Sequence, residues 1–297
     1  SRRQRQMCIR DRFEGDCLKY LKQFPDNSID MVLCDLPYGT TQNKWDSVIP
    51  LCKLWKEYER VVKDNGAIVL TSQGLFTAQL MISNPKMFKY KWIWEKSKPT
   101  NFLNAKKQPL RKYEDICVFY KKQPTYNPQM TKGEPYNKGI RKKQLSGSYG
   151  EFQPVHVHSN GDRYPIDIIY FKTAESEGRV IHPTQKPIEL GRYLIRTYSN
   201  PGDLILDNTF GSGSFLVAAL LEGRNMFAIK RGRNPNWIRA DSTANNPLVI
   251  DYQNNGYNCG PTSLSMGIQM FGEYISENTL AKEGGTTRNG TSPAQLK

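Results

Sequence analysis

The chain contains the stretch Ile29-Asp30-Met31-Val32-Leu33-Cys34-Asp35-Leu36-Pro37-Tyr38. Its apolar first part predicts a buried strand, and its last four residues place a carboxylate, a rigid turn and an aromatic ring at the carboxyl end of that strand. Ligands of open α/β sheets bind at the carboxyl ends of the strands. The stretch therefore predicts both an α/β fold and a site at this end of the sheet.

The tetrapeptide at the end of this strand suits chemistry on a flat, weakly nucleophilic exocyclic amine. Asp35 can accept a hydrogen bond or a proton from the amine, and a backbone carbonyl at Leu36 or Pro37 can accept a second hydrogen bond. The ring of Tyr38 offers a face for a base that has left its stack. An ordinary strand end followed by a proline turn explains the tetrapeptide equally well, so the other motifs decide between the two interpretations.

A second predicted strand, Asp203-Leu-Ile-Leu-Asp207, runs into a turn with Gly211 and Gly213 and then into an apolar helix. The glycines let a ligand approach the backbone, and the helix N-terminus offers free N–H groups to an anion. The dinucleotide fingerprint needs a third glycine where this chain has Leu216, and the P-loop needs a lysine that does not follow here. A cofactor that carries a carboxylate fits this turn better than a pyrophosphate.

Between these motifs lies His182-Pro183-Thr184-Gln185-Lys186-Pro187, followed by a helical pattern to Tyr198. Alone, this segment predicts only a proline-rich entry into a helix. Together, the three motifs resemble those of the DNA amino-methyltransferases that use S-adenosylmethionine. The catalytic motif precedes the cofactor motif, as in the circularly permuted β group of that family. The resemblance covers residues 13–229.

The resemblance implies a three-layer, Rossmann-like α/β sheet, S-adenosylmethionine as cofactor and double-stranded DNA as partner, with no metal. An aspartate at the first catalytic position implies transfer to adenine-N6, because serine is commoner there in cytosine-N4 enzymes. The implied catalytic residues are Asp35, Pro37 and Tyr38. The implied cofactor-binding residues are Asp16, Thr184, Lys186, Asp207, Phe210, Gly211, Gly213 and Ser214.

Two positions depart from the family pattern. Leu36 replaces a proline, and we expect it to loosen the turn and to reduce activity without abolishing it. Lys230 stands where the family has an acidic residue that binds the ribose hydroxyls, and an ammonium cannot accept their hydrogen bonds. We therefore expect weak cofactor binding. The alternatives are a cytosine-N4 enzyme, a catalytically impaired DNA-binding protein, and a cysteine peptidase fused to a DNA-binding region.

The composition agrees with a partner that is a polyanion. The 297 residues carry a net charge of +14 and have a pI near 9.4. Six cysteines occur without a C-x-x-C pair, which favours a reducing, cytoplasmic compartment over a disulfide framework or a zinc site. We expect no membrane span and no signal peptide, because no apolar run is long enough for the first and no apolar segment follows the basic start.

The basic residues are concentrated in the middle of the chain. From Lys86 to Lys143 they outnumber the acidic residues about four to one, and aromatic residues are interleaved with them. We interpret residues 97–165 as a target-recognition insert that contacts phosphates and base edges, although a solvated loop has the same composition. His156 and His158 lie there without a nearby carboxylate or cysteine cluster, so a metal site is not expected.

Both ends of the chain have sequence patterns unlike those of the middle. Residues 1–12 are expected to be an extraneous leader, and residues 230–250 a junction. Residues 251–297 include Gln253 and Cys259, and they resemble the N-terminal part of papain-like bacteriocin-processing and pseudomurein-cleaving cysteine peptidases. A thiolate peptidase also needs a histidine base, and no histidine follows His182. We therefore expect this segment to be an inactive fragment.

Overall fold

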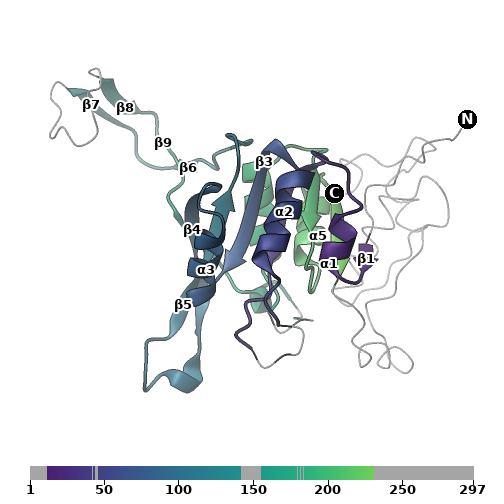
Figure 1. Cartoon of the computed structure of the whole chain (residues 1–297). Coiled ribbons are helices and arrows are strands. Elements are labelled where there is room, and N and C mark those ends of the chain that lie inside the picture. The colour runs from purple at the N-terminus through teal and green to yellow at the C-terminus, as the bar shows by residue number, and fades with distance from the viewer. Residues whose placement is uncertain are drawn as a thin grey trace, which may run out of the picture.

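The computed structural model describes residues 12–41, 43, 46–141, 155–178, 180, 182 and 184–230. An eight-stranded sheet forms the centre, with the strand order β1-β12-β11-β2-β3-β5-β4-β10 (Figure 1). Neighbouring strands are parallel except at β5, which is antiparallel to both β3 and β4. The strands of this sheet are β1 (Arg12–Glu14), β2 (Ile29–Asp35), β3 (Val62–Ser72), β4 (Phe88–Thr100), β5 (Arg111–Phe119), β10 (Ile168–Phe171), β11 (Leu204–Asp207) and β12 (Asn225–Lys230).

Helices cover both faces of the sheet, and each face has its own hydrophobic core. The helices are α1 (Cys17–Leu21), α2 (Leu51–Val61), α3 (Leu75–Ser83), α4 (Ile188–Tyr198) and α5 (Ser214–Leu221). Helices α1, α2 and α3 pack on one face and α4 and α5 on the other. Within β2, Val32 and Cys34 enter the first core, whereas Met31 and Leu33 enter the second, because successive side chains of a strand point to opposite faces. The predicted three-layer α/β fold is confirmed.

The two predicted motif strands are neighbours in the sheet. Ile205 and Leu206 of β11 lie beside Met31 and Val32 of β2. From β11 the chain continues through α5 to β12, and from β2 it continues through α2 to β3 on the other side. The direction of winding therefore reverses between β2 and β11, which is the position where open α/β sheets bind their ligands.

The predicted recognition insert consists of two structures that leave the sheet at different places. The β4–β5 hairpin, with the 3-10 helix η1 (Phe102–Asn104) near its tip, extends from the carboxyl end of β4. Beyond β5, the N–H of Lys122 bonds to Asp64 O near the start of β3, at the opposite edge of the sheet. The chain then forms two narrow ribbons that project away from the hairpin (Figure 1).

The ribbons are short antiparallel pairs. They consist of β6 (Thr131–Lys132) with β9 (Asp162–Arg163), and β7 (Tyr136–Arg141) with β8 (Val155–Ser159). Residues 121–165 show no hydrophobic periodicity, so the sequence did not predict these strands. A second 3-10 helix, η3 (Ala174–Ser176), follows β10. In the described part of the chain, no helix is both long and apolar enough to cross a membrane.

Candidate active site

The carboxylate of Asp35 lies at the end of β2 and is bound by side chains from three other parts of the chain. The hydroxyl of Tyr38 donates a hydrogen bond to it at 2.9 Å, and the hydroxyl of Thr71 on β3 donates another. The ammonium of Lys186 lies 2.9 Å from it. Thr71 was not predicted from the sequence, although a polar residue at the end of the apolar run of β3 is a signal that can be recognised.

Tyr38 is held as firmly as the carboxylate that it contacts. Its ring stacks on Phe76 of α3 with centroids 5.1 Å apart, and Lys186 Nζ lies 5.4 Å from the ring centroid. Burial, together with the charge of Asp35, raises the pKa of the Tyr38 phenol well above its usual value, so it remains a donor. A base that stacks on Tyr38 must share the ring with these neighbours.

The turn after β2 is anchored on both sides. Leu36 is buried in the core on the α1–α3 face, and Pro37 is half-buried. The carboxylate of Asp46 accepts hydrogen bonds from the N–H groups of Gly39, Thr40 and Thr41 at 2.8, 3.0 and 2.7 Å. Asp46 was not predicted from the sequence, because a single aspartate in a polar loop carries no distinguishing pattern.

Asp207 ends β11 and is 3% exposed. Its carboxylate accepts a hydrogen bond from the N–H of Thr209 at 3.1 Å and forms no salt bridge within the described part of the chain. Burial raises the pKa of Asp207 to about 7, and the charge of Asp35 adds to the effect. The hydroxyl of Thr209 donates to the backbone carbonyl of Asp35 at 3.1 Å, so the ends of β11 and β2 are joined.

The turn after β11 contains two glycines and leads into α5. Gly213 adopts a φ of 83°, which favours glycine, and it offers no side chain to cap α5, although the N–H of Ser214 contacts Ser212 Oγ at 3.4 Å. A Cβ on Gly211 would lie 3.3 Å from the ring of His182. Ser214 is the first residue of α5, and the N–H of Phe210 bonds to Ile229 O at 3.2 Å. These residues fit a cofactor that carries a carboxylate.

The segment from His182 to Lys186 contacts the glycine turn at one end and Asp35 at the other. The ring of His182 lies against Gly211, and Thr184 contacts His182 Nδ1 through its N–H at 3.3 Å and its hydroxyl at 3.1 Å. Thr184 and Lys186 were both expected on the cofactor side of the site. The ammonium of Lys186 lies 2.9 Å from the carboxylate of Asp35, because a buried cation needs carboxylate partners and Asp35 supplies one.

Two other expected cofactor contacts are farther along the same edge of the sheet. Asp16 follows β1 and is exposed, and its carboxylate caps α1 by accepting a hydrogen bond from the N–H of Leu18 at 2.9 Å. Strand β12 separates β1 from β11. Lys230 ends β12, where its backbone pairs with Glu14. The side chain of Lys230 lies outside the described part of the structure, as do residues 231–297 with Cys259.

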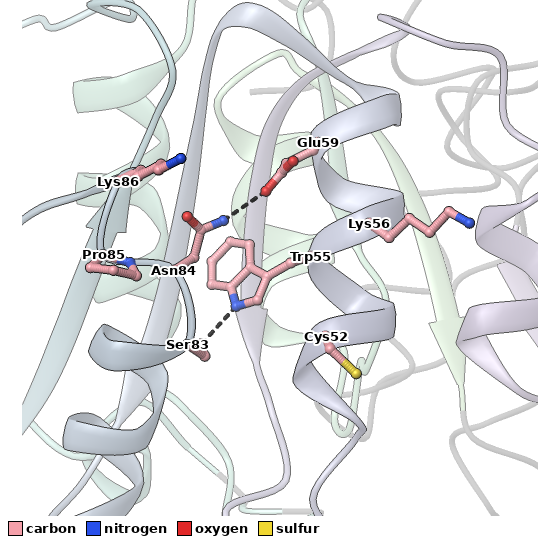
Figure 2. Close-up of a pocket in the computed structure, with 8 residues that line it drawn as sticks. All are labelled: Cys52, Trp55, Lys56, Glu59, Ser83, Asn84, Pro85 and Lys86. Carbon is pink, nitrogen blue, oxygen red and sulfur yellow. Dashed lines mark hydrogen bonds between the residues drawn. The ribbon is translucent and has the colours of Figure 1, made fainter.

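A pocket of about 420 Å³ lies between α2 and the end of α3 (Figure 2). Figure 2 shows Trp55 Nε1 donating to Ser83 Oγ at 2.7 Å, and Asn84 Nδ2 donating to Glu59 Oε1 at 2.8 Å. The pocket shares no residue with the site around Asp35. Its lining residues are Cys52, Trp55, Lys56, Glu59, Ser83, Asn84, Pro85 and Lys86.

The fold and the site define an α/β protein in which a glycine-containing turn after β11 lies beside the polar carboxyl end of β2. The family described as DNA methylase (N6_N4_Mtase) matches residues 29–277, and the chain belongs to this family. The DNA adenine methyltransferase YhdJ of Escherichia coli (strain K12) is 28% identical over 234 residues, which cover 73% of this chain and 76% of that protein. The family match extends past residue 229, where the sequence motifs predicted the end of the domain.

Two solved structures share the fold. The PvuII DNA methyltransferase, described as cytosine-N4-specific, aligns with a TM-score of 0.55 and 15% identity, covering 90% of this chain and 95% of that one. The complex of M1.HpyAVI with SAM aligns with a TM-score of 0.51 and 21% identity, covering 75% and 94%.

Proposed function

We propose that the chain transfers the methyl group of S-adenosylmethionine to the exocyclic N6 of adenine in double-stranded DNA. The observation that carries the proposal is the contact between the two motifs: Thr209, next to Asp207, bonds to the backbone of Asp35 at the switch point of the sheet. A catalytic carboxylate and a cofactor turn are thereby held side by side. The order β2, residues 182–187 and β11 supports membership of the permuted β group.

The residues at the end of β11 fit the cofactor. We propose that Asp207, Phe210, Gly211, Gly213 and Ser214 line its amino-acid end, with Thr184 closing that side. The positive dipole end at the N-terminus of α5 favours a carboxylate, and the buried carboxylate of Asp207 is without a cation among the described residues. Asp16 would lie toward the adenine end. When bound, the cofactor supplies a methyl group on a sulfonium.

The chain's own residues would position the target amine and exclude water from it. Asp35 accepts a hydrogen bond from the amine, directs its lone pair toward the methyl group, and takes up the proton that the nitrogen releases after transfer. Tyr38 fixes Asp35 and provides an aromatic wall, and Pro37 holds the turn whose carbonyl accepts the second N–H. Placing the two reactants in line can account for much of the rate enhancement.

The second candidate is transfer to cytosine-N4. Cytosine also carries a flat exocyclic amine, and the neighbour with the TM-score of 0.55 is described as cytosine-N4-specific. The relative YhdJ, described as a DNA adenine methyltransferase, and the aspartate at position 35 favour adenine. Mass spectrometry of nucleosides from DNA treated with the enzyme separates the candidates: N6-methyl-2′-deoxyadenosine supports the proposal, and N4-methyl-2′-deoxycytidine overturns it.

We further propose that residues 13–229 form the methyltransferase domain, with residues 97–165 as its recognition insert, and that residues 251–297 are a separate fragment. The exposed cations of the hairpin between β4 and β5 support the assignment of a recognition insert, because this hairpin leaves the sheet at the same edge as Asp35. The family match to residue 277 overlaps the fragment. Methyl transfer by a chain that ends at residue 250 tests the boundary.

A further inference from the structure

A row of polar side chains crosses four strands on the α4 face of the sheet. Asp35 of β2, Thr71 of β3, Glu114 of β5 and Lys96 of β4 are each two residues from a member of the core on that face. Side chains two apart in a strand point to the same side. The four side chains therefore point to the same face near Asp35, in a staggered line: Thr71 lies beside Asp35, whereas Glu114 lies one step farther along and pairs with Trp94. We call these four side chains, together with Lys186, the row. The neighbouring core residues are Leu33, Val69, Ile116 and Trp94.

Lys186 lies just before α4 and contacts two carboxylates of this row. Its ammonium lies 2.9 Å from the carboxylate of Asp35 and 3.3 Å from Glu114 Oε2, while Lys96 Nζ lies 3.3 Å from Glu114 Oε1. The order Lys96–Glu114–Lys186–Asp35 alternates in sign, so the formal charges cancel. Asp35 is the last member of this order, and its carboxylate also accepts a hydrogen bond from the hydroxyl of Thr71.

Both lysines of the row are buried: Lys96 is 3% exposed and Lys186 is 7% exposed. Burial alone would lower the pKa of Lys186, but the charges of Asp35 and Glu114 outweigh it and raise that pKa well above its usual value. Glu114 Oε2 is buried and makes no hydrogen bond, so the charge of Lys186 is what compensates it. Apolar residues could fill this space without the cost of burying ions, so stability alone does not account for the row.

We propose that Lys186 is a positioning residue for methyl transfer and that Glu114, supported by Lys96, holds Lys186 in place. Lys186 binds the carboxylate of Asp35 and fixes its orientation toward the target amine. The proposal depends on the proposed role of Asp35. The proposal gives Lys186 a role distinct from that of the cofactor-binding residues. The partners of Lys186 are Asp35 and Glu114, and Glu114 lies on β5, on the side of β2 away from β11.

Single-turnover methyl transfer and calorimetric cofactor binding, measured on the full chain with saturating DNA, test the proposal. Lys186→Gln should slow transfer by roughly tenfold to a hundredfold, the range expected when a hydrogen bond between charged groups is removed. Its cofactor Kd should stay within about threefold of the parent, on the same free-energy scale. Lys186→Arg should retain more activity than Lys186→Gln, because it keeps the charge.

A double-mutant cycle tests the role of Glu114. Because Glu114 acts through Lys186, Glu114→Gln with Lys186→Gln should be no slower than Lys186→Gln alone. Lys91→Gln is the matched control. Lys91 pairs with Asp115 at 2.6 Å across the same two strands but does not touch Asp35, so its loss should leave the rate unchanged.

Three outcomes overturn the proposal: an unchanged rate in Lys186→Gln, a cofactor Kd that weakens as much as the rate falls, or additive effects of the two substitutions. If Lys186→Gln does not fold, the charge-balanced double variant replaces it, with the same expected loss of rate and unchanged Kd. Failure of the proposed function is a different result, because the parent protein itself would then methylate no DNA.

Discussion

At the scale of single residues, Asp35 has more partners than any local pattern suggests. Tyr38, Thr71 and Lys186 all bind its carboxylate, and Thr209 binds its backbone carbonyl. A group with this many partners is fixed before the substrate arrives. Such preorganisation is what a reaction by positioning requires.

Replacing Asp35 should therefore separate catalysis from cofactor binding. We expect Asp35→Ala to abolish methyl transfer and to leave cofactor affinity largely intact, because the carboxylate acts on the target amine. Asp35→Asn is the control that keeps the shape of the side chain. The measurements are transfer of labelled methyl groups to DNA and calorimetry with the cofactor. Parental transfer rates in Asp35→Ala would falsify this role.

Asp207 should make the stability of the cofactor-free protein depend on pH. Its pKa of about 7 lies above the ordinary value of 3.8, so the folded state binds the proton more tightly and stability falls as pH rises between these values. About two pH units of this interval lie above pH 5, which corresponds to about 3 kcal/mol. Urea unfolding at pH 5 and pH 8 should show this loss in the parent and not in Asp207→Asn. Equal losses in both proteins would assign the dependence to another group.

Lys230 is the residue at which the family pattern predicts weak cofactor binding. A carboxylate at this position would accept hydrogen bonds from ribose hydroxyls, each worth roughly 1.5–3 kcal/mol. We expect Lys230→Glu to bind the cofactor about tenfold to a hundredfold more tightly. Lys230→Gln controls for removal of the cation alone. If calorimetry gives the same Kd for Lys230→Glu and the parent, the ribose-contact assignment is wrong.

At the scale of elements, the recognition insert is divided. The β4–β5 hairpin extends from the carboxyl edge of the sheet, where Asp35 lies, whereas the ribbons of β6–β9 and β7–β8 follow a connection at the opposite edge (Figure 1). The hairpin therefore lies at the same end of the sheet as Asp35. The hairpin is thus the part of the insert that we expect to hold phosphates next to the site.

Neutralising the hairpin should weaken DNA binding in a salt-dependent way. Arg111→Gln with Lys112→Gln should lower the slope of log K against log salt by about one unit for each phosphate that the protein no longer neutralises. Arg141, Lys142 and Lys143 were predicted to contribute as well, but their side chains lie outside the described part of the structure. Lys122→Gln, at the opposite edge beside Asp64, is the control and should leave the slope unchanged. An unchanged slope in the hairpin variant places the DNA path elsewhere.

At the scale of the whole molecule, the methylase family accounts for most of the chain, and its match overlaps residues 251–277 of the segment that was expected to be a peptidase-like fragment. We expect Cys259→Ser to leave methyl transfer unchanged, because Cys259 is not among the residues proposed to bind the cofactor or the target amine. A thiol-reactive peptide probe should label Cys259 no faster than the exposed Cys52. Selective labelling of Cys259 would favour the peptidase alternative.

The resemblance to a known family implied the three-layer sheet, and the sequence by itself determined the two motif strands and their carboxyl-end residues. These features are local: an apolar run predicts a strand, and the residue after it must lie at the edge of the sheet. The apolar runs at residues 92–94 and 116–120 predict strands for the same reason. The first lies within β4, and the second lies in β5 except for Tyr120, which follows the end of that strand. The contact of Asp35 with the glycine turn follows from the carboxyl-end rule once the sheet is parallel there.

Only the tertiary structure decided which side chains surround Asp35. Thr71, Glu114 and Lys96 reach one row because β5 runs antiparallel between β3 and β4, and local patterns do not encode strand order or register. Lys186 lies 151 residues from Asp35 in the sequence, and its motif was assigned to the cofactor. Its position is set by the requirement that a buried ammonium meet carboxylates, a condition that depends on where the folded chain brings them.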